Sequence, residues 1–90
     1  MIIISYDIKD DKLRARFSKM LTRHGAIRLQ YSVYEVNNTS RIIENIKIQI
    51  TEKYGRQFTA ADSVVIFEMN DANVMKFGNA IHRDKDIVYL

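Results

Sequence analysis

The chain opens with Met1-Ile-Ile-Ile-Ser-Tyr-Asp7, a β-branched run that ends in a carboxylate. A short apolar run between polar residues is typical of a buried central strand. Asp7 would leave the carboxyl end of this strand, and either Asp10 or Asp11 would cap the helix that follows. The opening residues therefore predict a central strand that presents an acidic side chain at its end.

A helix from Asp11 to His24 is predicted by the spacing of its apolar side. The residues of this side fall at offsets 0, 4, 7, 8 and 11, which is one helical face: Leu13, Phe17, Met20, Leu21 and His24. Gly25 supplies the stop. A basic stripe runs beside the apolar face and contains Lys12, Arg16, Lys19 and Arg23. Arg14 lies on the opposite flank, so Arg14 and Arg16 bracket the buried face.

The remaining elements predict the order of the fold. Residues 27–36 alternate as in a strand, either as one bent strand or as two. A turn at 37–40 begins a second helix that runs to about Tyr54 and buries Ile42, Ile43, Ile46 and Ile50, with Ile48 on the far side. Three further strands are predicted, over residues 63–69, 74–78 and 87–90, with a turn at 70–71 between the first two. This order predicts an α+β, ferredoxin-like βαββαβ domain with an extra C-terminal strand, with both helices on one face of the sheet.

The length and composition predict a single domain, residues 1–90, that forms a dimer or depends on an obligate partner. A chain of 90 residues has a marginal core, and this one has no cysteine and only two histidines, His24 and His82, too far apart to suggest a metal clip. A second copy could cover the sheet face that the helices leave open. The absence of cysteine favours an intracellular protein, and no apolar run is long enough to predict a signal or a membrane span.

Basic residues concentrate at the start of the chain. Residues 1–30 hold seven Lys or Arg and three Asp, whereas residues 31–90 hold seven basic and eight acidic residues. A one-sided basic field attracts a polyanion, with nucleic acid as the first candidate and an acidic protein as the second, the alternative being that the charge serves only solubility. We predict phosphate contacts from Arg14, Arg16, Lys19, Arg23 and Arg28, the alternative being a solvated helix face. Tyr31 and Tyr34 could stack on bases or belong to the core or an interface.

Asp7 is the candidate catalytic and metal-binding residue. A carboxylate at a strand end suits Mg²⁺, or Mn²⁺, but one carboxylate alone is a poor site. A two-fold axis could bring together the Asp7 residues of two copies, which would share one metal for phosphodiester attack. The alternative is a turn or cap aspartate. Tyr6 has a functional role only if Asp7 has one, His24 is predicted to be structural and His82 solvated.

Three segments, in order, resemble one family closely. They are Ile4-Ser-Tyr-Asp-Ile8, Asp10-Asp-Lys-Leu-Arg-Ala-Arg16 and Arg28-Leu-Gln-Tyr-Ser-Val-Tyr-Glu35. The family is the second, smaller CRISPR-associated adaptation protein. The resemblance covers nearly the whole chain, and the ordered set is far more specific than any one segment.

The resemblance implies a prokaryotic, cytoplasmic, ferredoxin-like homodimer. Its C-terminal strand would pair with the sheet of the partner subunit, so residues from about 70 to 90 would serve dimerisation and partner docking. The resemblance also implies a metal-dependent endonuclease on RNA or DNA. Asp7 of each subunit would be its centre, accompanied by Tyr6, Arg14, Arg16, Arg28 and Tyr34, the last being phenylalanine in many relatives.

The resemblance implies, in addition, a scaffold in spacer acquisition. One dimer would bridge dimers of the larger CRISPR-associated integrase and lie along the double-stranded protospacer DNA. We favour this scaffold role, because one carboxylate per subunit without an obvious general base makes a weak hydrolytic site. A metal-dependent nuclease acting on its own, on single-stranded RNA or on DNA, is the alternative, and a toxin-like ribonuclease is a minor one.

Overall fold

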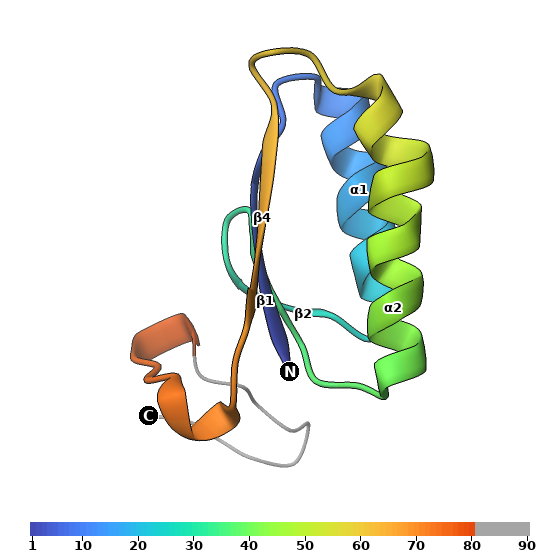
Figure 1. Ribbon diagram of the computed structural model, residues 1–90. Coiled ribbons are helices and arrows are strands. Elements are labelled where there is room, and N and C mark those ends of the chain that lie inside the picture. Colours follow the sequence, from blue (N-terminus) through green and yellow to red (C-terminus); the bar gives the residue numbers. More distant parts are fainter. Residues whose placement is uncertain (81–90) are drawn as a thin grey trace.

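The computed structural model describes residues 1–80 and shows one antiparallel sheet covered on one face by two helices (Figure 1). The elements are β1 (Ile2–Asp7), α1 (Asp11–Arg23), β2 (Ile27–Gln30), β3 (Val33–Val36), α2 (Ser40–Gln49) and β4 (Ser63–Glu68). The strands lie in the order β2-β3-β1-β4, with β1 in the interior of the sheet. The ferredoxin-like α+β prediction is confirmed.

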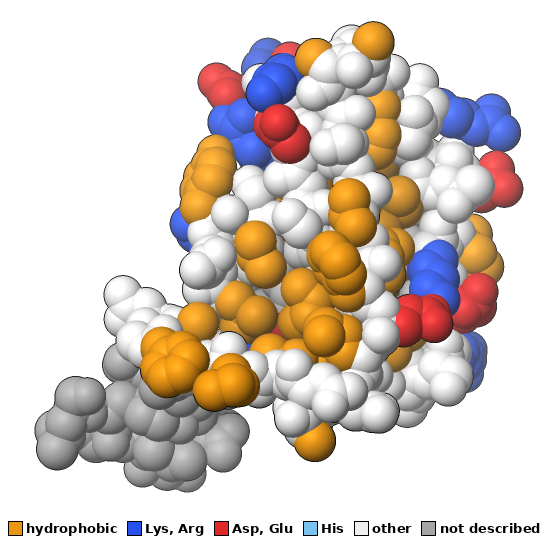
Figure 2. All heavy atoms as spheres, turned by 60° about the vertical axis from the view of Figure 1, so that its left-hand side comes forward, with side chains coloured by type: hydrophobic (Ala, Val, Ile, Leu, Met, Phe, Trp, Pro, Cys, Tyr) orange, Lys and Arg blue, Asp and Glu red, His pale blue; other side chains and the backbone are white. Residues whose placement is uncertain are grey.

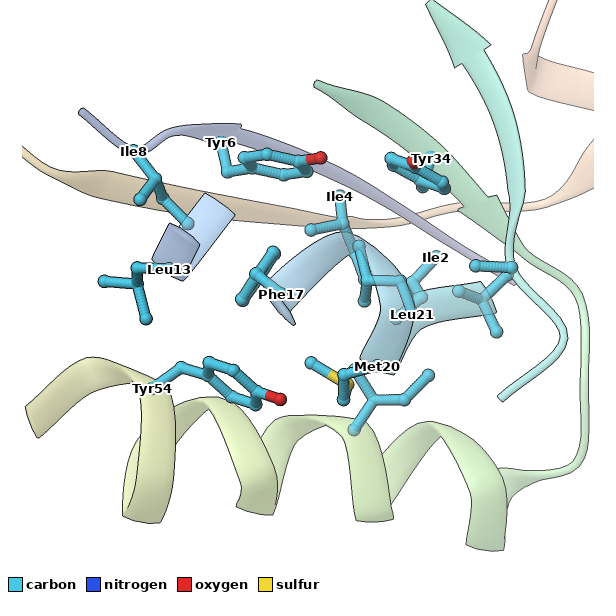
Figure 3. Packing of buried hydrophobic residues seen from close by; sticks show 13 residues of the cluster. Ile2, Ile4, Tyr6, Ile8, Leu13, Phe17, Met20, Leu21, Tyr34 and Tyr54 are labelled. Atoms are coloured by element: carbon cyan, nitrogen blue, oxygen red, sulfur yellow. The ribbon is translucent and has the colours of Figure 1, made fainter. Parts of the chain in front are cut away.

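The two faces of β1 have different environments, as its alternation requires. Ile2, Ile4 and Tyr6 point toward the helices and are buried, whereas Asp7 at the strand end is exposed. Figure 3 shows the three inward side chains packed over Phe17, Leu21 and Met20 of α1 and facing α2. Each fully buried side chain of this size contributes about 1.5–3 kcal/mol, so this layer contributes substantially to the stability of the fold.

Two residues define the ends of α1: Asp10 caps its start, and Gly25 follows its last turn. Asp10 is the cap, because its Oδ2 accepts the backbone N–H of Leu13 at 2.8 Å. Asp11 is therefore the first helical residue. The helix ends at Arg23 with His24 as its cap, and Gly25 follows with a φ of +84°, the left-handed conformation that favours glycine. The predicted stop is confirmed.

Residues 27–36 form two strands joined by a tight turn. Ser32 sits in this turn with a φ of 64°, and its carbonyl accepts the backbone N–H of Tyr6 at 3.1 Å. The second helix follows the predicted course, with Ile46 buried and Ile48 exposed. After Gln49 it widens into a π-helical turn, Ile50–Tyr54, and ends in a 3₁₀ turn at Gly55–Gln57.

The predicted strand over Val74–Gly78 is wrong. This stretch lies between two 3₁₀ turns, Asp71–Asn73 and Gly78–Ala80, and within residues 1–80 it pairs with no strand. It leaves β4 and reaches the far edge of the sheet, where Gly78–Ala80 lies against β2. A β-prone segment becomes a strand only where a neighbouring edge runs alongside it. The predicted strand over 87–90 lies outside the described residues.

In the part of the chain that the structure describes, no helix combines the length and apolar composition needed to cross a membrane.

Candidate functional site

Asp7 is an exposed strand-end carboxylate, as predicted. It lies opposite Ser63 of β4, on the sheet face that the helices do not cover, and 62% of its side chain is exposed. Lys9 approaches it from two residues further on, with Nζ at 3.1 Å from each carboxylate oxygen. Asp7 is thus accessible to a ligand but already faces a cation of its own chain.

Asp62 is a second carboxylate at this end of the sheet, and sequence reasoning missed it. Its Oδ1 accepts the backbone N–H of Lys9 at 2.9 Å, and its Oδ2 accepts the backbone N–H of Thr59 at 2.7 Å. These hydrogen bonds, those of Thr59 first, lower the pKa of the Asp62 carboxyl. The available signal was Thr59-x-x-Asp62 just before a strand, a spacing at which the Asp side chain can accept the backbone N–H of the residue three positions earlier.

Residues 1–80 of one chain do not form a magnesium site by themselves. Within residues 1–80, no group of three or more acidic, histidine or cysteine side chains is placed to hold a metal ion. Asp7 offers one carboxylate, and Asp62 is occupied by backbone N–H groups. A metal held by Asp7 would need ligands from elsewhere, such as a second copy of the chain.

The basic stripe of α1 is on the surface. Lys12, Arg16, Lys19 and Arg23 are exposed, and in the described part of the chain none of them forms an ion pair. Arg16 makes one neutral contact, from Nη2 to Oε1 of Gln57 at 3.2 Å. The stripe can therefore bind phosphate oxygens without first breaking an ion pair within residues 1–80.

Arg14 has different surroundings from this stripe. Only 27% of its side chain is exposed, and its Nη1 donates to the carbonyl of Ile8 at 2.9 Å. Its Nη2 meets the Asp11 carboxylate at 2.5 Å, and that bond raises the pKa of the guanidinium. The side chain is directed at the loop between β1 and α1.

Tyr6 and Tyr34, which were predicted to accompany Asp7 in the site, belong to the core. Tyr6 and Tyr34 are buried and stacked, with ring centroids 6.1 Å apart, and the Tyr34 hydroxyl lies 2.6 Å from Ser18 Oγ. Burial, and then the neighbouring Tyr34, raise the pKa of Tyr6 to about 12. Both rings are buried and cannot stack on a base, so in this chain they contribute to the packing beneath β1 and β3.

Arg28 and Tyr31 form the exposed pair of the β2–β3 hairpin. The guanidinium carbon of Arg28 lies 5.4 Å from the centroid of the Tyr31 ring, and 67% of Tyr31 is exposed. This is a cation–π contact, and an exposed aromatic ring beside an arginine could also stack on a base. His24, in contrast, bonds the Met20 carbonyl through Nδ1 at 2.7 Å, which agrees with its predicted structural role.

Comparisons with known proteins identify one family and two similar folds. The family described as CRISPR associated protein Cas2 matches residues 1–77. A crystal structure of Cas2 aligns with a TM-score of 0.69 and 22% identity, covering 99% of this chain and 93% of that one. A hypothetical protein of Thermus thermophilus, TT1823, aligns with a TM-score of 0.65 and 24% identity, covering 86% of this chain and 88% of that one. No curated protein sequence matches.

Proposed function

The chain belongs to the Cas2 family of CRISPR-associated proteins, and from this premise we propose that it is a homodimeric scaffold of CRISPR adaptation that binds the backbone of duplex DNA. Its partners would be a second copy, the protospacer duplex and the larger integrase subunit, in the cytoplasm of a prokaryote. The observation that carries the DNA-binding part is the basic stripe of α1, which is exposed and forms no ion pair within residues 1–80.

The stripe has dimensions that suit a phosphate backbone. Lys12 and Arg23 are eleven positions apart on a regular helix, a rise of about 16 Å at 1.5 Å per residue. All four cations, Lys12, Arg16, Lys19 and Arg23, project from one side of it. Phosphate contacts of this kind position a duplex without reading its sequence, which a protein that handles foreign DNA of any sequence requires.

A second copy has a surface on which to dock. The sheet face opposite the helices carries exposed apolar side chains, and Figure 2 shows them gathered into one area. Cross-strand pairs align Ile3 with Phe67 and Ser5 with Val65 on this face, while Met75 and Phe77 lie exposed on the segment that follows β4. Patches of this type mark interaction sites. The patch supports the homodimer and agrees with the marginal core expected of a chain of this length.

The salt dependence of duplex binding tests the scaffold proposal. We expect that replacing Arg16, Lys19 and Arg23 together by Gln weakens binding to duplexes of unrelated sequence by the same factor. The slope of log K against log salt should become shallower by about 0.9 for each phosphate that the variant no longer neutralises. Arg41→Gln is the matched control, because Arg41 is exposed, on α2, and forms no ion pair within residues 1–80. A triple variant with the wild-type slope contradicts the phosphate assignment.

The second candidate function is a metal-dependent nuclease. It is supported by the family, which is nuclease-related, and by the exposure of Asp7 at its strand end. One carboxylate per chain, paired with Lys9, makes this the weaker candidate. Asp7→Ala should remove any Mg²⁺-dependent cleavage and leave duplex binding and spacer integration intact. If integration is lost while the dimer persists, Asp7 belongs to the essential machinery and the scaffold view is wrong.

A further inference from the structure

The segment from Asp7 to Lys9 joins β1 to α1, and most of its backbone groups lie beyond the sheet. Asp7 is the last residue paired in β1, and α1 begins at Asp11. The carbonyls of Ile8 and Lys9 and the N–H of Lys9 therefore need partners outside the strand ladder. Side chains from two other parts of the chain supply those partners.

Arg14 holds the segment from the helix side. Its Nη1 donates to the carbonyl of Ile8 at 2.9 Å and approaches that of Lys9 at 3.4 Å. Its Nη2 is occupied by the Asp11 carboxylate, which fixes the plane of the guanidinium. A planar fork with several donors can hold two carbonyls and a carboxylate together, whereas an ammonium group cannot reproduce that geometry.

Asp62 holds the same segment from the other side. It lies in the loop before β4, fixed by its bonds to Thr59, and its Oδ1 accepts the N–H of Lys9. The backbone of Lys9 is thus hydrogen-bonded on both sides: its N–H donates to Asp62, and its carbonyl accepts from Arg14. The Lys9 side chain in turn meets both oxygens of Asp7, so the held segment also carries the cation that faces the Asp7 carboxylate.

We infer that Arg14 and Asp62 are positioning residues that together clamp the Asp7–Lys9 segment, and that Arg14 acts on this loop and not on a phosphate. The basic residues of α1 then divide by role. The exposed stripe that contains Arg16 binds DNA, and Arg14 orients the strand end. The statement about DNA rests on the proposed function, whereas the clamp itself does not.

Amide hydrogen exchange in the full-length protein tests the clamp. We expect Asp62→Ala to lower the protection of the Lys9 amide by roughly 5- to 10-fold, the effect of removing one hydrogen bond. Arg14→Lys, which keeps the charge and makes no contact with that amide, should lower it as well. Arg16→Lys is the matched control and should not change it. The Leu13 amide, bound to Asp10 in the same way, should keep its protection in every variant.

The salt slope of duplex binding supplies the second readout. Arg14→Gln should keep the wild-type slope, whereas Arg16→Gln should make it shallower by about 0.9. The inference is overturned by wild-type protection of the Lys9 amide in Arg14→Lys, or by a slope in Arg14→Gln that falls as it does in Arg16→Gln. A wild-type slope in the stripe variants would instead reject the proposed function, and the exchange result would still decide the clamp.

Discussion

Tyr6 shows how burial changes the chemistry of one side chain. The residue next to it along β1, Asp7, is exposed, whereas Tyr6 is buried against Tyr34 and Phe17. Burial raises the pKa of Tyr6 from its ordinary value of 10.0 to about 12. The folded protein thus keeps this proton at a pH where the unfolded chain has released it. The resulting stabilisation is fully present below pH 10.0 and is lost as the pH rises toward 12.

Tyr6→Phe should therefore flatten the alkaline pH dependence of stability. The difference in free energy of unfolding between pH 10 and pH 12 should shrink by up to about 2 kcal/mol, measured by urea denaturation, since each pKa unit corresponds to about 1.4 kcal/mol. Tyr31→Phe is the control, because Tyr31 is largely exposed. Equal pH dependence in wild type and Tyr6→Phe would show that Tyr6 ionises as freely in the folded state as in the unfolded one.

Residue types were predictable from the sequence, but their contacts were not. The helical period placed Arg14 and Arg16 on opposite flanks of α1, and the structure has them there, one against the Ile8 carbonyl and the other against Gln57. The period carries no information about which flank faces a loop. That depends on where β1 ends and where the loop of Asp62 returns, which are long-range consequences of the fold.

At the scale of elements, the segment after β4 is attached to the sheet by an ion pair. Glu35 of β3 points to the open face and is only 2% exposed, and Lys76 Nζ lies 2.5 Å from its Oε1. Burying a carboxylate is costly unless a charged partner accompanies it. Lys76 thereby links the segment after β4 to the sheet and places a positive charge beside the buried Glu35 carboxylate.

Lys76→Met should destabilise the protein by about 2 kcal/mol, because it removes a charged partner from a buried carboxylate. Adding Glu35→Gln should recover part of this loss, so the two substitutions should be non-additive by roughly 1 kcal/mol in a double-mutant cycle. Lys47→Met is the control, since its partner Glu68 is exposed and such a pair contributes about 0–1 kcal/mol. Additive effects of the Glu35 and Lys76 substitutions would show that the pair is not coupled in solution.

Elements with a strong period were predicted well, and those that depend on a neighbour were not. The burial of Leu13, Phe17 and Ile46 follows from helical spacing alone. The stretch 74–78 has a strand-like composition, but in the described structure it crosses to the edge strand β2 without pairing with it as a strand. The π-helical turn at Ile50–Tyr54 had no signal in the apolar spacing, which continues through it.

At the scale of the whole molecule, the uncovered sheet face requires an explanation. Helices bury one face, whereas on the other Val65 and Phe67 of β4 remain about half exposed. Apolar area excluded from water contributes about 25 cal/mol per Å², so a small domain with one bare sheet face gains much by pairing. A two-fold arrangement through this face would also bring Asp7, which lies on it, toward its counterpart.

Phe67→Glu should therefore weaken self-association. A charge buried in the interface by each copy, together with the removal of an apolar ring from each, should cost at least about 2 kcal/mol, roughly a 30-fold rise in the dimer dissociation constant. Sedimentation equilibrium measures that constant directly. Ile48→Glu is the matched control. Ile48 is 54% exposed and Phe67 is 50% exposed, but Ile48 lies on α2, away from the open face of the sheet. If Phe67→Glu dimerises as the wild type does while Ile48→Glu does not, the copies meet through the helices, and the open sheet face must have another occupant.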